Sequence, residues 1–164
     1  PSQRRTRPVF ATQEQAEAEA LRQVQAEVER YDGDPALVER AARWRYTADF
    51  FVLRFDVGRF DEMTQKPMKT FRPVSRSAGG WRVGDPEGPL PLYRVDRLPA
   101  DGPAFICEGE KATDAAASLG LAAVTSAHGS GAAHRTDWGP VAGRKCFILP
   151  DNDTGTLVGK WRPS

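Results

Sequence analysis

Three carboxylates follow apolar segments in the second half of the chain. Glu108 comes directly after the run 103–107, and Asp151 and Asp153 come directly after the run 144–150. Residues two apart in an extended segment point the same way, so the two aspartates are expected to share a face. Ligands of open parallel sheets bind beyond the carboxyl ends of the strands. Three converging carboxylates without histidine or cysteine suit a hard cation, so we expect a Mg²⁺ or Mn²⁺ site here.

The residues around these carboxylates are suited to phosphate chemistry. Gly109 lets backbone come close at the turn, and the helix expected to follow directs free N–H groups and a positive dipole end at an anion. Lys111 would add a phosphate contact there. In the loop 128–143, His128 and Arg135 are each interpreted in two ways, as phosphate contacts or as ordinary surface residues.

The elements that would position this site alternate between strand and helix. Short apolar strands alternating with a helix predict a parallel sheet with right-handed crossovers, and therefore an α/β fold. Gly120 stands where a helix commonly ends. The expected elements are a strand at 103–107, a helix at 111–119 and strands at 121–126 and 144–150.

The first half of the chain predicts a helix followed by a β-rich segment. Thr12 is a suitable N-cap for a helix over 12–30, whose apolar residues recur at spacings of three and four. A short helix is expected over 35–42. Strands are expected over 44–60 and 69–76, and a glycine- and proline-rich loop over 84–91. The expected divisions are a disordered tail (1–11), a helical segment (12–42), a β-rich segment (43–100) and the α/β domain (101–164).

Charge is unevenly distributed along the chain. Segment 43–82 has nine Lys or Arg against four acids, whereas segment 101–164 has six against seven. A basic segment beside a metal site suits a nucleic-acid backbone, and the alternative is a set of solvated strand faces. The candidate nucleic-acid contacts are Lys69, Arg72, Arg76 and Arg82.

Several classes of protein are disfavoured. No apolar run approaches the roughly 20 residues that span a membrane, and no apolar signal region follows the arginines of 1–7. We therefore expect a cytoplasmic protein without a membrane partner. Cys107 and Cys146 form no CxxC pair and lie in apolar runs, so we expect core residues and no zinc ribbon.

Two stretches of the chain resemble a known family. FICEGEKATDA (105–115) and FILPDND (147–153) resemble the Toprim domain that primases, topoisomerases and some nucleases share. The resemblance is closer to phage- and plasmid-type primase or primase–helicase proteins. Its further marks precede the domain: KTFR (69–72), GGW (79–81) and LYRVDRL (92–98).

This resemblance implies a Toprim-like Rossmannoid sheet, preceded by a small β-rich segment and an N-terminal helix. It implies that Glu108 acts as general acid or base and that Asp151 and Asp153 bind the metal. Many members have Asp four residues after the glutamate, where this chain has Ala112, so Asp114 is expected as a supporting residue beside Glu110. The implied activity is Mg²⁺-dependent nucleotidyl transfer in replication priming, with single-stranded DNA, nucleoside triphosphates and a replicative helicase or helicase domain as partners.

Two alternatives stay open. The same carboxylates suit a Toprim nuclease, and the chain can also be a non-catalytic nucleic-acid-binding remnant. The family pattern continues past the aspartates with a helix and a strand, whereas eleven residues, without an acid, follow Asp153 here. We therefore expect a poor primase, explained by truncation, a frameshift or a split protein completed by a partner.

Overall fold

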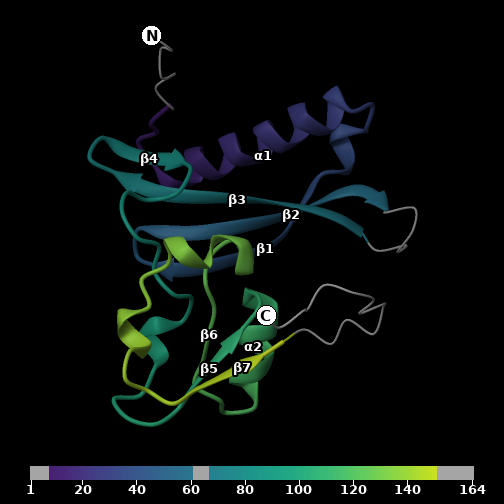
Figure 1. Ribbon diagram of the computed structural model, residues 1–164. Helices are drawn as coiled ribbons and strands as arrows, with labels where there is room; N and C mark the ends of the chain where they lie inside the picture. Colours follow the sequence, from purple (N-terminus) through teal and green to yellow (C-terminus); the bar gives the residue numbers. More distant parts are fainter. Residues whose placement is uncertain (1–7, 61–66, 151–164) are drawn as a thin grey trace. The chain divides into compact units, whose positions relative to one another are not determined.

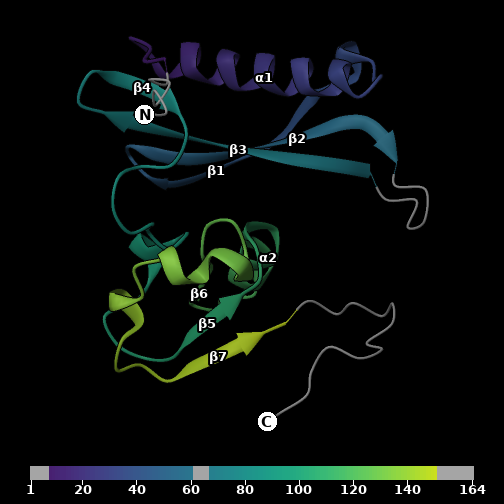
Figure 2. The same cartoon turned by 45° about the horizontal axis from the view of Figure 1, so that its top comes forward.

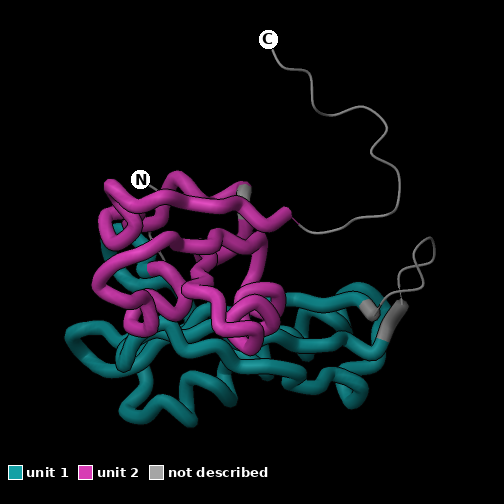
Figure 3. The backbone as a smooth tube through the Cα atoms, turned by 90° about the horizontal axis from the view of Figure 1, so that it is seen from below, with its two compact units in different colours: residues 1–91 teal, residues 92–164 magenta. Residues whose placement is uncertain are grey.

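The computed structural model describes residues 8–60 and 67–150, which form two compact units, 1–91 and 92–164 (Figure 3). The boundary lies at the end of the loop 84–91, so the segment 92–98, which was grouped with the β-rich residues 43–100 in the sequence, lies in the second unit. The architecture is α/β, with a four-stranded antiparallel sheet in the first unit and a three-stranded parallel sheet in the second. Each unit is described by itself below.

The first unit begins with the helix α1 (Gln13–Arg30), as its capping sequence predicts. Thr12 and Gln15 form a capping box, in which each residue's side chain accepts a hydrogen bond from the other's backbone N–H. The buried stripe of α1 consists of small or branched residues four positions apart: Ala16, Ala20, Val24 and Val28. Figures 1 and 2 show α1 lying lengthwise along one face of the antiparallel sheet.

The sheet of the first unit is a simple meander in the order β1-β2-β3-β4. Its strands are β1 (Glu39–Thr47), β2 (Phe50–Phe60), β3 (Pro67–Ser77) and β4 (Gly80–Val83). Alternate residues of β2 and β3 face α1, and the core that they form with the helix contains Phe51, Leu53, Phe55 and Val74.

The prediction of a helix over 35–42 is wrong beyond the first turn. Pro35–Leu37 form a single 3₁₀ turn (η1), capped by the Asp34 side chain, and β1 begins at Glu39. Glu39 and Arg40 already pair with Asp56 and Phe55 of β2. Cross-strand pairing with a segment far along the chain thus overrides the local helical pattern.

The second unit contains the parallel sheet, in the order β6-β5-β7. The strands β5 (Ala104–Cys107), β6 (Ala123–Val124) and β7 (Cys146–Leu149) run parallel, with the helix α2 (Glu110–Ser118) between β5 and β6 in the chain (Figure 1). Between residues 92 and 150 the unit also contains three 3₁₀ turns: η2 (Val95–Arg97), η3 (Ser130–Arg135) and η4 (Gly139–Val141).

Both faces of β5 are covered, as expected of a central parallel strand. On one face, Phe105 and Cys107 pack with Ala116 of α2. On the other face, Ala104 and Ile106 pack with a cluster that includes Leu92, Val124, Val141 and Trp138. Trp138 is thus a packing residue, and its indole N–H donates to the carbonyl oxygen of Ala133 at 2.9 Å.

β7 is much more exposed than β5. Ile148 is 75% exposed and Phe147 is 40% exposed, although Phe147 stacks on Phe105 with ring centroids 5.3 Å apart. Cys107 is buried, as expected, whereas Cys146 is exposed, so the expectation of a core residue is wrong for Cys146. The reason is strand order, because Cys146 lies on an outer strand of the described sheet rather than on β5.

Candidate functional site at the carboxyl edge of the parallel sheet

Glu108 lies between the end of β5 and the start of α2, and its side chain is exposed. Gly109 is the N-cap of α2 and has an extended backbone. Its carbonyl oxygen accepts hydrogen bonds from both the backbone N–H (3.0 Å) and the hydroxyl (2.8 Å) of Thr113. The turn that presents Glu108 is therefore held firmly to the first turns of the helix.

The register of the sheet places the end of β7 beside the end of β5. Cys107 pairs with Leu149 in a parallel register, so both strands end at the same edge. The sequence prediction required these two strands to lie near each other, and they are direct neighbours. Asp151 and Asp153 themselves lie outside the described residues, so their convergence with Glu108 stays a prediction.

The end of β6 is tied to the same edge. The hydroxyl of Thr125, just beyond β6, donates to the carbonyl oxygen of Cys107 at 2.7 Å, and both residues are buried. The chain then turns through His128 and Gly129, whose φ angles are both positive (63° and 70°). Glycine adopts positive φ readily because it has no Cβ, which accounts for Gly129 at this turn. His128 is exposed at this turn.

Asp114 forms a polar cluster with two other side chains of the second unit. Its Oδ1 accepts hydrogen bonds from the hydroxyl of Tyr93 at 3.0 Å and from Nη1 of Arg94 at 3.3 Å. Burial of the Tyr93 ring, followed by its hydrogen bond to Asp114, raises the pKa of the Tyr93 hydroxyl to about 12. The hydroxyl therefore stays protonated, and remains a donor to Asp114, throughout the physiological range.

Arg94 has a strained backbone. It has φ 61° and ψ 22°, the left-handed conformation, which costs a residue with a side chain about 1–2 kcal/mol. The sequence predicts Asp114 as a supporting residue but gives Tyr93 and Arg94 no role in the site. The only signal for the pair in the sequence is the LYR triplet at 92–94, which precedes Asp114 by about 20 residues.

The remaining predicted residues of this unit lie at the start of α2 and at the end of η3. Glu110 and Lys111 lie in the first turn of α2, with Glu110 partly buried and Lys111 exposed. Arg135 is exposed at the end of η3.

The four basic candidates of the first unit lie on opposite faces of the antiparallel sheet. Arg72 and Arg76 share the α1 face with Val74, because alternate residues of a strand face the same side. Lys69 lies on the other face, and so does Arg82, which pairs with Ser75. The four therefore form two pairs rather than one continuous patch.

Hydrogen bonds hold two of these four side chains, and Nη1 of a third, Arg76, lies 3.9 Å from Oδ1 of Asp49. Arg72, 20% exposed, forms an ion pair with Glu27 and donates to the hydroxyl of Thr70 at 2.9 Å. Arg82, 21% exposed, lies 3.8 Å from Glu87 and donates to the Asp85 carbonyl oxygen at 3.1 Å.

The other two basic side chains lie near aromatic rings. The Arg76 guanidinium, on a side chain 61% exposed, is 6.0 Å from the Trp81 ring. Nζ of Lys69 is 6.0 Å from the ring of Phe71. Trp81 itself packs against the hydrophobic core beneath α1, so it is a packing residue.

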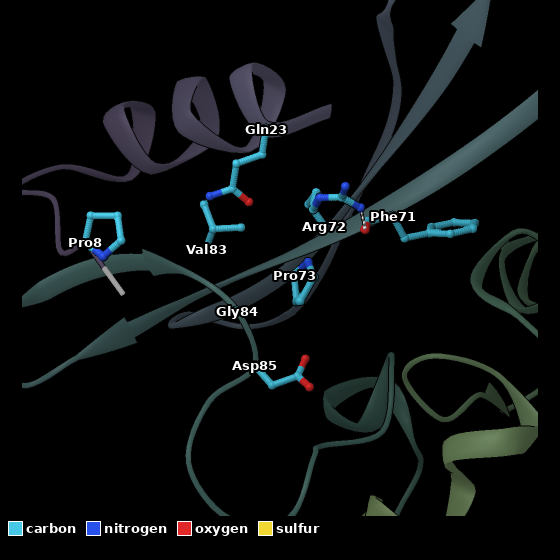
Figure 4. Close-up of a pocket in the computed structure, with 8 residues that line it drawn as sticks. All are labelled: Pro8, Gln23, Phe71, Arg72, Pro73, Val83, Gly84 and Asp85. Atoms are coloured by element: carbon cyan, nitrogen blue, oxygen red, sulfur yellow. Dashed lines mark hydrogen bonds between the residues drawn. The ribbon is translucent and has the colours of Figure 1, made fainter. Parts of the chain in front are cut away.

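A shallow cavity of about 390 Å³ in the first unit includes Arg72 (Figure 4). Gln23 of α1 and Asp85 also line it, together with Pro73 and Val83. Arg72 is already paired with Glu27 there, so the cavity combines one neutralised cation with a carboxylate.

The donor set available for a metal is only partly described. Within residues 8–60 and 67–150, no group of three or more His, Cys, Asp or Glu side chains is arranged to hold a metal ion. Glu108 is the one expected ligand inside these ranges, and an exposed carboxylate at a sheet edge suits a hard, hydrated cation. No described helix is both long and apolar enough to cross a membrane. No family model, curated protein or solved structure matches the chain.

Proposed function

We propose that the chain is a Toprim-like protein of the primase type, which uses Mg²⁺ to act on nucleic acid. The observation that supports this best is the parallel order β6-β5-β7, with Glu108 directly after β5 and Asp151 two residues after the end of β7. In this arrangement β7, which the two aspartates follow in the sequence, ends at the same edge as β5, where ligands of parallel sheets bind.

In this proposal, Glu108, Asp151 and Asp153 would hold the cation, which would neutralise charge on a transferring phosphate. Glu108 would also accept the proton of the attacking 3′ hydroxyl, and its exposed position leaves room for a substrate. The start of α2, with Lys111 in its first turn, favours an anion beside Glu108. Of the basic residues of β3 and β4, the exposed Arg76 would contact the template backbone.

A primer-synthesis assay tests this proposal. The purified chain would be incubated with single-stranded DNA, ribonucleotides and Mg²⁺ or Mn²⁺, and we expect a low yield of extended product. Glu108→Gln should abolish the product, because the amide neither accepts the proton nor attracts the cation strongly. Asp101→Asn is the matched control, since Asp101 is an exposed carboxylate before the opposite, amino end of β5.

The length of labelled DNA separates the proposal from its alternatives. Shortening that disappears in Glu108→Gln would replace priming by hydrolysis at the same carboxylates. Binding without any change in length would indicate a non-catalytic module. Extension that persists unchanged in Glu108→Gln would contradict the proposed site.

A further inference from the structure

The guanidinium of Arg94 is anchored but not saturated with hydrogen bonds. Nη1 donates to a single oxygen of Asp114, at 3.3 Å, and that oxygen also accepts from Tyr93. The Nε atom is buried and has no hydrogen-bond partner in the described part of the chain. Buried donors are nearly always paired in native proteins, so an unpaired one requires an explanation.

The Arg94 side chain also reaches solvent. It is 33% exposed, and Asp114 is 41% exposed, so the pair lies at the surface of the second unit. An arginine fork matches a phosphate with two parallel N–H···O bonds. The single long bond to Asp114 orients the Arg94 guanidinium before a phosphate binds. Other N–H donors of the guanidinium remain available to the phosphate oxygens.

Two connections tie this pair to the strand end that bears Glu108, one through hydrogen bonds and one through the backbone of α2. Tyr93 donates through its backbone N–H to the Thr125 carbonyl oxygen at 2.8 Å, and the Thr125 hydroxyl donates to the Cys107 carbonyl oxygen at 2.7 Å. On α2, Asp114 follows Thr113, which bonds twice to the carbonyl oxygen of Gly109.

Cys107 and Gly109 flank Glu108 in the sequence, so both connections end at a residue next to Glu108. The left-handed backbone of Arg94 lies where the chain leaves its bridge to Thr125 and enters η2. Strained backbone at a residue with a long polar side chain is typical of functional sites.

We infer that Arg94 is a phosphate-binding residue, which Asp114 and Tyr93 orient toward the edge that bears Glu108. Its ligand is an oxygen of a phosphate group, supplied either by a free nucleoside triphosphate or by a nucleic-acid backbone. This inference rests on the proposed function for its place in a reaction, but phosphate binding by Arg94 does not require a metal.

Metal-free binding measurements test the inference. Tripolyphosphate, ATP and a single-stranded oligothymidine would each be titrated into the full chain by calorimetry in the presence of EDTA. We expect Arg94→Gln to weaken the binding of at least one phosphate ligand by about tenfold or more, the usual effect of losing a charge-assisted bond. A loss confined to tripolyphosphate and ATP identifies a free nucleotide, and a loss confined to the oligothymidine identifies the backbone.

The control is Arg97→Gln. Arg97 lies in the same turn, is 73% exposed and pairs with Asp96 at 3.4 Å, so its removal changes the net charge equally. Arg94→Lys keeps the charge but loses the fork, and should weaken binding several-fold while the melting temperature changes little. That variant decides the question if Arg94→Gln does not fold.

Equal binding by wild type and Arg94→Lys, or an equal loss in Arg97→Gln, would overturn the inference. The outcome is separable from the proposed function, because Glu108→Gln should leave metal-free phosphate binding intact while it abolishes metal-dependent turnover. Phosphate binding that depends on Arg94 in a chain without turnover would support this inference and count against the primase proposal.

Discussion

The hydroxyl of Thr125 lies 2.7 Å from the carbonyl oxygen of Cys107 and donates a hydrogen bond to it between two buried residues. This bond joins the ends of β6 and β5 one residue before Glu108. Thr125 also accepts, through its own carbonyl, the backbone N–H of Tyr93. One threonine thus connects the two strand ends to the segment that carries Arg94.

Replacing this threonine should destabilise the second unit. Thr125→Val keeps the shape but removes the donor, and we expect a loss of about 1–2 kcal/mol in the free energy of unfolding. Thr136→Val is the matched control, because the Thr136 hydroxyl is buried and has no partner among the described residues. That change should be neutral or stabilising. Urea denaturation of both variants checks the prediction, and equal effects would contradict it.

The Tyr93 hydroxyl should ionise at a higher pH than an ordinary tyrosine. Burial and the hydrogen bond to Asp114 raise its pKa from 10.0 to about 12 in the folded chain. The pKa of this hydroxyl is higher in the folded chain than in the unfolded chain. Protonated Tyr93 therefore stabilises the fold fully below about pH 10, and this stabilisation is lost as the pH rises from about 10 to about 12. Tyrosinate absorbance of wild type and Tyr93→Phe would isolate this ionisation, and Asp114→Asn should lower its pKa. An ordinary value in the wild type would contradict the prediction.

Metal binding should be weak and should depend on the expected carboxylates. Cations held by a few carboxylates keep several waters and bind loosely. Paramagnetic broadening by Mn²⁺ should therefore centre on residues near Glu108 and disappear in the double variant Asp151→Asn with Asp153→Asn. Asp101→Asn should broaden like the wild type. Unchanged broadening in the double variant would move the metal elsewhere.

The basic residues of the antiparallel sheet should differ in their effects. Arg76→Ala should reduce the salt dependence of single-stranded DNA binding by about 0.7 in slope, the loss of one phosphate contact. Arg72→Ala should instead lower stability, because Arg72 bonds to Glu27 and Thr70. Fluorescence titration at several salt concentrations and thermal unfolding separate the two effects. Identical slopes for wild type and Arg76→Ala would place the DNA on another surface.

Local patterns in the sequence were sufficient to predict most helices and strands. The N-cap residue Thr12 and the apolar spacing of three and four predict a helix over 12–30, which the structure confirms as α1 over Gln13–Arg30. The apolar runs before Glu108 and Asp151 predict strands, and β5 and β7 confirm them. These features depend on residues a few positions apart, so their cause is contained in a short stretch of chain.

Features that depend on distant partners were predicted less well. The residues 39–42 form part of β1 rather than a helix, because β2 pairs with them. The basic candidates Arg72 and Arg82 point to opposite faces, which only the register of the sheet reveals. Cys146 is exposed because its strand lies outside β5 in the described sheet.

The sequence by itself determined the residue types of the candidate site and the place of Glu108 directly after an apolar strand. Only the tertiary structure decided that β7 lies next to β5, so that both strands end at one edge. It alone also brought Arg94 to Asp114, which lies 20 residues further along the chain. The physical reason is that strand order and side-chain pairing follow from packing between distant segments, for which no local spacing provides a signal.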